Sequence, residues 1–238
     1  RPMRQRTVEF GGVKRSYPVC APADHTGALP VIVALHGKGD NGRDFLAGTG
    51  LHRARAIVAA PTGAGLAWAP APYARTTFEE DAAFVRALLD DLRSTFATGN
   101  TYLAGFSNGG GLAVHLSLTD LELAGVATVA AAVRATPDEL TAAQPLDYLN
   151  IHGAFDDVVP FAGEQRSPYS GAEDDTTFGA PEVVAAFERR NGDRARATLT
   201  AVEGMGHEWP TGPWAARRGV DATEAILDFF EIEHNRAG

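Results

Sequence analysis

Apolar residues follow two alternating patterns along the chain: short continuous runs, and longer stretches with a helical period. The short runs are rich in β-branched residues, which is typical of strands buried on both faces of a sheet. They lie at residues 31–35, 56–59, 102–104, 126–129, 149–151 and 197–200. Strands that alternate with helices indicate βαβ units. We therefore predict a mostly parallel sheet covered by helices on both faces.

The stretches with a helical period carry start and stop signals. Thr77 and Glu80 have the spacing of a capping box, and apolar residues follow them at helical spacing. Asp221 and Glu224 have the same spacing before the last apolar stretch. Pro181 is expected to open another helix, which the Asn-Gly pair at residues 191–192 ends.

The N-terminal segment predicts a hairpin. Residues 7–10 and 16–19 read as strands, and Gly11 and Gly12 between them favour a tight turn. This hairpin adds antiparallel strands at one edge of the sheet. The chain shows no internal repeat and no low-complexity linker, so we expect a single domain over residues 1–238.

Composition and charge exclude several classes of function. The formal net charge is −9, which argues against nucleic acid as a partner because such contacts need clustered positive charge. No apolar run approaches the roughly 18 residues that would insert into a membrane. The single cysteine, Cys20, can form neither an intramolecular disulfide nor a thiolate zinc cluster.

The strongest chemical motif is G-x-S-x-G at residues 105–109, with Ser107 at its centre. The motif follows a predicted strand and precedes a predicted helix over residues 110–114. A sharp strand-to-helix turn of this kind exposes the serine hydroxyl, and its flanking glycines avoid collisions with neighbouring backbone. We interpret Ser107 as a nucleophile.

A serine nucleophile needs a base, and this fold type places the acid and then the base after the serine in the chain. Of seven histidines, His207 lies in a glycine-containing loop after the last predicted strand, and we choose it as the base. His25 and His52 precede the nucleophile, and His115 lies in the helix after it. His234 lies in a tail that is expected to fray. His36 and His152 each end a strand in a His-Gly pair, where we expect a structural role.

The acid and the oxyanion hole are expected at two further strand ends. Asp156 is the first choice for the acid and Asp157 the second, because both follow the predicted strand at residues 149–151. An oxyanion hole needs backbone N–H donors. We assign these to Asn108, directly after the nucleophile, and to Lys38 in the glycine-rich loop after residues 31–35, with the Lys38 ammonium in solvent.

Other residues leave alternatives open. Trp68 and Trp209 either line a substrate pocket or pack in the interior. The acidic stretch at residues 173–175 is expected to be a solvated loop rather than a metal site, since no histidine or spaced carboxylate completes a coordination shell. We predict no metal and no cofactor.

Several segments together resemble the polyhydroxybutyrate depolymerase-like and feruloyl/acetylxylan esterase group of α/β-hydrolases. The resemblance is carried by Leu35-His36-Gly37, by the motif at residues 105–110, by Ile151-His152-Gly153 with Asp156 and residues 158–160, and by Gly206-His207 with Trp209-Pro210. It implies an α/β-hydrolase fold without a substantial lid, and a triad of Ser107, Asp156 and His207.

The resemblance also implies a function: hydrolysis of small or surface-presented carboxylic esters, of feruloyl, acetyl or short hydroxyalkanoate type. Polymer-degrading members usually carry a cysteine where this chain has Lys38, and this difference favours a smaller ester. The resemblance favours export, with the cytoplasm as the alternative, and leaves the oligomeric state open. Two rival functions are acyl transfer to a sugar or lipid, and ligand binding without catalysis on the same scaffold.

Overall fold

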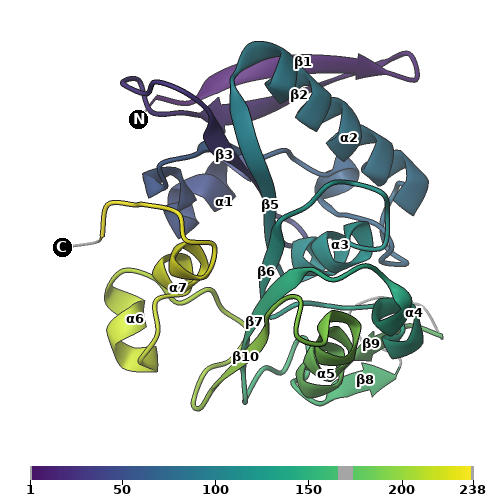
Figure 1. Cartoon of the computed structure of the whole chain (residues 1–238). Coiled ribbons are helices and arrows are strands. Elements are labelled where there is room, and N and C mark those ends of the chain that lie inside the picture. Colours follow the sequence, from purple (N-terminus) through teal and green to yellow (C-terminus); the bar gives the residue numbers. More distant parts are fainter. Residues whose placement is uncertain (1, 166–173, 237–238) are drawn as a thin grey trace.

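The computed structural model describes residues 2–165 and 174–236. Its largest unit is an eight-stranded sheet in the order β1-β2-β4-β3-β5-β6-β7-β10 (Figure 1). These strands are β1 Arg4–Phe10, β2 Val13–Cys20, β3 Leu29–Leu35, β4 Ile57–Ala59, β5 Thr98–Phe106, β6 Gly125–Val129, β7 Asp147–Gly153 and β10 Ala197–Val202. β2 pairs antiparallel with both β1 and β4, and the remaining neighbours are parallel. The predicted sheet and its N-terminal hairpin are confirmed.

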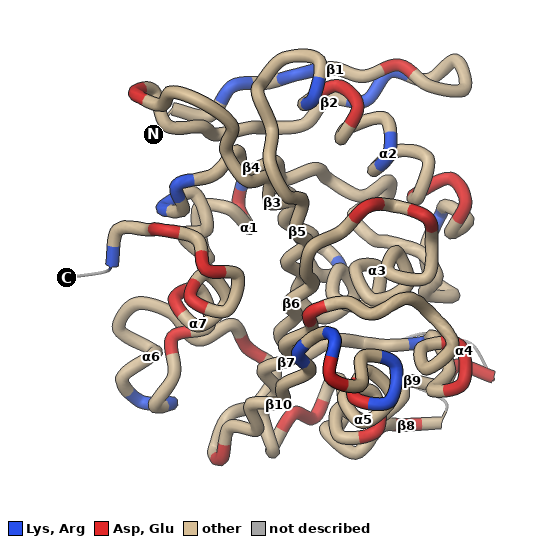
Figure 2. Tube along the Cα trace, in the orientation of Figure 1, with Lys and Arg blue, Asp and Glu red and all other residues tan. Residues whose placement is uncertain are grey.

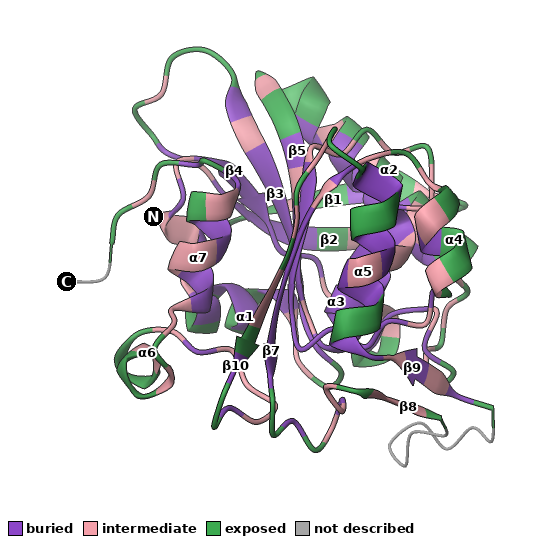
Figure 3. Ribbon diagram, turned by 60° about the horizontal axis from the view of Figure 1, so that its bottom comes forward, coloured by how far each residue is buried: buried purple, intermediate pink, exposed green. Residues whose placement is uncertain are grey.

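The sheet is buried on both faces because its strands alternate side chains between two apolar layers. In β3, Val31 and Val33 enter one layer, whereas Ile32 enters the other. Helices α2 Phe78–Thr95, α3 Asn108–Leu116, α4 Pro137–Ala142 and α5 Ala180–Asn191 cover the first face. Helices α1 Gly42–Thr49, α6 Pro213–Arg218 and α7 Ala222–Phe229 lie on the second (Figures 1 and 3).

The predicted helix starts are confirmed, and Asp221 makes one contact that the sequence did not predict. Thr77 caps α2 in a complete capping box with Glu80. Asp221 caps α7 by accepting from the backbone N–H of Glu224. The Asp221 carboxylate also accepts from Thr211 Oγ1 at 3.1 Å, and this bond ties the preceding loop to α7. The Asp221 side chain thus serves two segments at once.

Several short elements were not predicted from the sequence. They include two three-residue helices, Leu51–Arg53 and Ala64–Leu66, and the short pair of strands β8 Gly163–Gln165 and β9 Thr176–Phe178. The helices α1, α4 and α6 were not predicted either. α4 does carry a readable signal, since Thr136 and Glu139 form a capping box around Pro137. The three-residue elements are too short for an apolar pattern to repeat, so hydrophobic periodicity does not reveal them.

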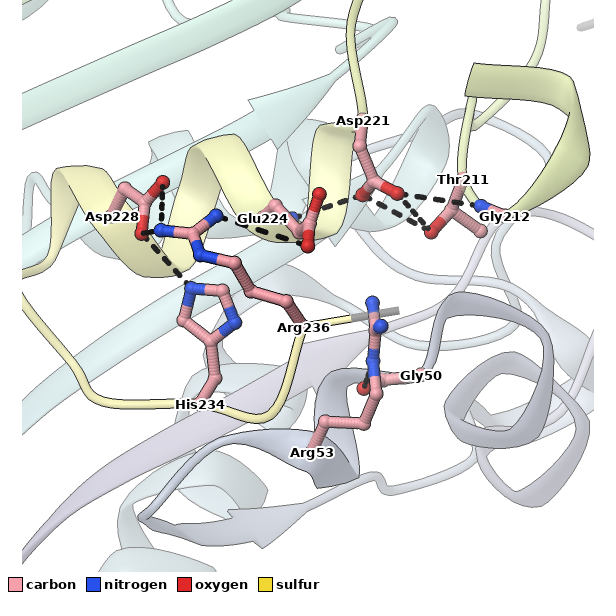
Figure 4. A network of polar contacts seen from close by, with 9 residues as sticks. All are labelled: Gly50, Arg53, Thr211, Gly212, Asp221, Glu224, Asp228, His234 and Arg236. Atoms are coloured by element: carbon pink, nitrogen blue, oxygen red, sulfur yellow. Dashed lines mark hydrogen bonds and ion pairs between the residues drawn. The ribbon is translucent and has the colours of Figure 1, made fainter. Parts of the chain in front are cut away.

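The C-terminal tail is docked rather than frayed, which corrects the expectation for His234. The His234 side chain is 3% exposed, and its Nε2 lies 2.9 Å from Asp228 on α7 (Figure 4). Arg236 reaches the same carboxylate at 3.1 Å and Glu224 at 3.8 Å.

Acidic residues lie on helices of both faces, among them Glu79 and Glu224, and the negative charge is not confined to one face (Figure 2).

The N-terminal hairpin is held to α2 by one carboxylate. Asp91 accepts from Arg6 Nε at 2.8 Å and Arg6 Nη2 at 3.0 Å, and from the Tyr17 hydroxyl. The hydrogen bond from Arg6 is the largest influence on Asp91, and its pKa lies below the ordinary value of 3.8. Tyr17 itself is fully buried.

Asp91→Asn should lower the free energy of unfolding at pH 7 by about 1–3 kcal/mol, because charged hydrogen bonds are lost. A carboxylate with a depressed folded pKa stabilises fully above its unfolded pKa, and that contribution is lost as the pH falls through the folded value. Urea unfolding should therefore show the difference between wild type and variant shrinking from about pH 4 towards pH 2.

Asp90→Asn is the matched control, since Asp90 is 69% exposed and pairs only at 3.4 Å with Arg93. It should change the free energy of unfolding by less than about 0.5 kcal/mol. An Asp91→Asn deficit that stays constant over the acid range would contradict the assignment.

Candidate active site

Ser107 occupies a strained turn between β5 and α3. Its φ of 53° and ψ of −115° lie outside the regions favoured by residues with a Cβ, at a cost on the order of 1–3 kcal/mol. The turn forces backbones together. A Cβ on Gly109 would lie 2.2 Å from the Leu35 carbonyl oxygen, and one on Gly105 would lie 2.5 Å from the Gly109 oxygen. These contacts explain the glycines of the motif.

His207 and Asp156 meet through loops that follow two neighbouring strands, β10 and β7. His207 Nδ1 donates to Asp156 Oδ2 at 2.9 Å. The loops approach closely at Gly153, where a Cβ would lie 2.2 Å from the Met205 carbonyl oxygen. Asp157 is exposed, so the geometry favours Asp156 as the partner of the histidine.

The Asp156 carboxylate is almost fully enclosed and well supplied with donors. Its Oδ1 accepts from the backbone N–H groups of Val158 at 2.9 Å and Val159 at 2.8 Å. Burial raises the pKa of Asp156, but the hydrogen bond and charge of His207 and the two backbone donors outweigh it, so the pKa lies below its usual value. The acid is therefore ionised at neutral pH and holds the proton of His207 on Nδ1.

The loop that carries Asp156 is held from behind by His152. His152 Nε2 donates to the Val159 carbonyl at 2.8 Å, and its Nδ1 lies 3.3 Å from the Asn150 side-chain amide. Asn150 Oδ1 in turn accepts from Thr128 Oγ1 at 2.8 Å. Burial lowers the pKa of His152, so the ring is neutral. These contacts agree with the structural role that we expect for His152.

His36 plays the same part for the loop after β3. Its Nδ1 donates to the Gly37 carbonyl at 2.6 Å, and its Nε2 accepts from the Gly63 N–H at 2.9 Å. Burial lowers the pKa of His36 as well. Trp68 is fully buried and donates through Nε1 to the His36 carbonyl at 3.1 Å. The alternative in which Trp68 lines a substrate pocket is thus wrong: it packs behind the loop.

Both residues expected to supply oxyanion donors lie near Ser107. Asn108 is the first residue of α3, and its side chain holds the Trp68 backbone with bonds of 2.8 and 2.9 Å. Lys38 lines the same cavity as Ser107. Its Nζ lies 4.4 Å from the centre of the Tyr73 ring, and the residue is exposed, in line with the expectation of a solvated ammonium.

Ser107 and His207 open on one cavity of about 300 Å³. The rest of its wall combines apolar and polar groups: Gly37, Lys38, Asp40, Tyr73, Phe106, Ala132, Arg134, Val158, Val159 and Thr177. Trp209 is not part of it. Its ring contacts Phe45 edge-on, and its Nε1 donates to Thr223 on α7 at 2.9 Å. Trp209 thus secures the loop of His207, and its ring centre also lies 6.4 Å from that of Phe106 in the cavity wall.

The acidic stretch at residues 173–175 departs from expectation at one residue: Asp174 is exposed, as expected, whereas Asp175 is buried. Glu173 lies outside the described residues, but the Asp175 side chain is only 2% exposed. It accepts from Arg134 Nε at 2.7 Å and Nη2 at 3.0 Å. The partners are far apart in the chain and share no local motif, so only tertiary structure reveals the pair. Arg134 and Tyr73 were not found as wall residues by sequence reasoning for the same reason.

Within residues 2–165 and 174–236, no cluster of three or more histidine, cysteine or acidic side chains could hold a metal ion. None of the helices described there is both long and apolar enough to cross a membrane.

Comparison with known proteins defines the class of fold. No family model matches the chain. It is 28% identical over 263 residues to the putative esterase NocK of Nocardia uniformis subsp. tsuyamanensis, covering 90% of this chain and 76% of the relative. It is 29% identical over 163 residues to the probable feruloyl esterase C of Aspergillus niger, covering 63% of this chain and 57% of the relative.

Among solved structures, Est1E from Butyrivibrio proteoclasticus with bound ferulic acid superposes with a TM-score of 0.66 at 13% identity. That match covers 95% of this chain and 98% of Est1E. The fold is that of the α/β-hydrolases, as predicted. The sequence relatives support an esterase within that fold, and the depolymerase-like subgroup is not singled out by them.

His152→Phe should lower kcat by on the order of 10–100-fold with little change in KM, because the Asp156 loop loses its support and His207 shifts. The measurement is steady-state turnover of p-nitrophenyl acetate, with circular dichroism to check folding. His115→Phe is the control, since His115 is a partly buried histidine that lines no part of the cavity. Equal losses in both variants would show that His152 contributes only to general packing.

Proposed function

We propose that this protein is a serine esterase that hydrolyses carboxylic esters through an acyl-enzyme. The observation that carries the proposal is the Asp156–His207 hydrogen bond of 2.9 Å at a cavity that Ser107 also lines. An ionised acid, an imidazole oriented by it and a serine on a strained elbow are the parts that acyl transfer requires.

In the first stage, Ser107 Oγ attacks the ester carbonyl carbon while His207 Nε2 takes the hydroxyl proton. The carbonyl oxygen becomes an oxyanion, and the backbone N–H groups of Lys38 and Asn108 stabilise it. The carbon–oxygen bond to the alcohol then breaks, and His207 returns the proton to the leaving oxygen. Asp156 stabilises the imidazolium between these transfers.

In the second stage, water attacks the acyl-enzyme. His207 Nε2 removes a proton from the water, and the same two N–H groups hold the second oxyanion. The bond to Ser107 Oγ breaks, the serine recovers its proton from His207, and the carboxylic acid is released. Each proton removed is returned within the cycle, and the net reaction is ester plus water to acid plus alcohol.

We propose small or surface-presented esters as substrates, of feruloyl, acetyl or short hydroxyalkanoate type. Three observations support this range. One sequence relative is named as a probable feruloyl esterase, and Est1E, which has a similar fold, binds ferulic acid. The cavity of about 300 Å³ suits one modest acyl or alcohol group rather than a long buried chain.

Ser107→Ala should lower kcat for p-nitrophenyl acetate by on the order of 10⁴–10⁶-fold while the protein stays folded. The same variant should lose covalent labelling by a fluorophosphonate probe, which reacts with activated serines. Near wild-type turnover in the folded variant would refute the assignment. Turnover without labelling in the wild type would indicate a different nucleophile.

Asp156→Asn should lower kcat by about 10³–10⁴-fold, because an amide can donate to Nδ1 and stabilise the wrong tautomer. Asp157→Asn is the matched control, since Asp157 is exposed and adjacent. Its kcat should stay within about twofold of wild type. A greater loss in Asp157→Asn than in Asp156→Asn would reverse the choice of acid.

A further inference from the structure

One residue in the wall of the cavity carries a buried polar atom with no partner among the described residues. The Thr177 side chain is on β9 and lines the cavity that Ser107 and His207 share, yet the residue is only 4% exposed. Its Oγ1 is buried and has no hydrogen-bond partner within the described part of the chain. A buried hydroxyl left unsatisfied destabilises the folded state, so its position needs an explanation.

Thr177, Arg134 and Tyr73 line the same cavity, and β9 is attached to the segment that carries Arg134. The backbone N–H of Phe178 donates to the Val133 carbonyl at 2.9 Å, which fixes β9 against the segment that carries Arg134. The guanidinium carbon of Arg134 lies 5.6 Å from the centre of the Tyr73 ring. Burial raises the pKa of Tyr73, while the charge of Arg134 and a hydrogen bond with it act in the opposite direction. Arg134 and Tyr73 both line the cavity.

The charges at this end of the cavity are balanced. Asp175 pairs with Arg134 through two bonds of 2.7 and 3.0 Å and is itself 2% exposed. Lys38 and Asp40, which carry opposite formal charges, also line the cavity. The wall therefore offers hydrogen-bonding groups without a net charge, and such a surface suits a neutral oxygen better than a carboxylate.

We propose that Thr177, Arg134 and Tyr73 form a subsite that binds an uncharged oxygen of the substrate, a carbonyl, hydroxyl or ether group on one arm of the ester. This inference rests on the proposed esterase function and narrows its substrate class to esters with an oxygenated arm. Thr177 is the specificity-determining residue, since substrate binding supplies the partner that its hydroxyl lacks.

The physical basis is an asymmetry in discrimination. A site built to hydrogen-bond a polar group rejects an analogue without that group, because its own buried polar atoms stay unpaired. A plain alkyl ester would leave Thr177 Oγ1 unsatisfied, whereas an oxygenated ester of the same size would pair with it. Preference for the oxygenated ester should therefore depend on the Thr177 hydroxyl.

The test compares p-nitrophenyl hexanoate with its 4-oxo and 5-oxo derivatives, which place a ketone at successive positions of the acyl arm, and with p-nitrophenyl hydrogen adipate, which carries a carboxylate. Wild type should show a higher kcat/KM for at least one ketone than for hexanoate. Thr177→Val, which keeps the side-chain shape, should reduce that ketone-to-hexanoate ratio by about 3–10-fold.

Thr176→Val is the matched control, because Thr176 is on the same strand but lines a separate hollow. Its ratio should stay within about twofold of wild type. An unchanged ratio in Thr177→Val would overturn the subsite, and a preference for the adipate ester would overturn its neutral character. If wild type hydrolyses none of these esters, or Ser107→Ala hydrolyses them equally well, the proposed function itself fails.

Stability provides a second readout that does not depend on turnover. Removing an unpartnered buried hydroxyl relieves its desolvation cost, so Thr177→Val should raise Tm by about 2–4 °C without substrate. Thr176→Val should not share this gain. A lower Tm in Thr177→Val would show that Oγ1 is already hydrogen-bonded in the free protein, which would overturn the proposal.

Discussion

Close backbone contact at the carboxyl ends of the parallel strands is the constraint on which the site depends. The elbow of Ser107 presses against the end of β3, where Gly109 leaves no room for a Cβ beside the Leu35 carbonyl. On the other side, Gly153 brings the end of β7 against the loop of His207. A parallel sheet places these loops along one edge, and the glycines let their backbones approach closely enough to share a cavity.

Two neutral histidines then fix the loops that this packing brings together. His36 holds the loop of Lys38, and His152 holds the loop of Asp156, each by hydrogen bonds to backbone atoms. Because burial lowers the pKa of both rings, neither adds a charge that would compete with His207 for the acid. Of these three histidines, only His207 lines the cavity with Ser107.

The site also retains features that cost stability. Ser107 has a backbone conformation that few residues adopt, and Thr177 keeps a buried hydroxyl without a partner in the described residues. Strain and unsatisfied polar groups of this kind persist where the surrounding structure is strong enough to impose them. Here the surroundings are the two apolar layers that cover both faces of the sheet.

Local periodicity and motif spacing predict the strand and helix pattern and the candidates Ser107, Asp156 and His207. Which groups meet depends on the packing of segments that are distant in the sequence. Trp68 is buried, Trp209 bonds to α7 and His234 is docked, and Arg134 pairs with Asp175 at a separation of 41 residues in the sequence. Contacts of this kind depend on how distant segments pack, and no local pattern of residues predicts them.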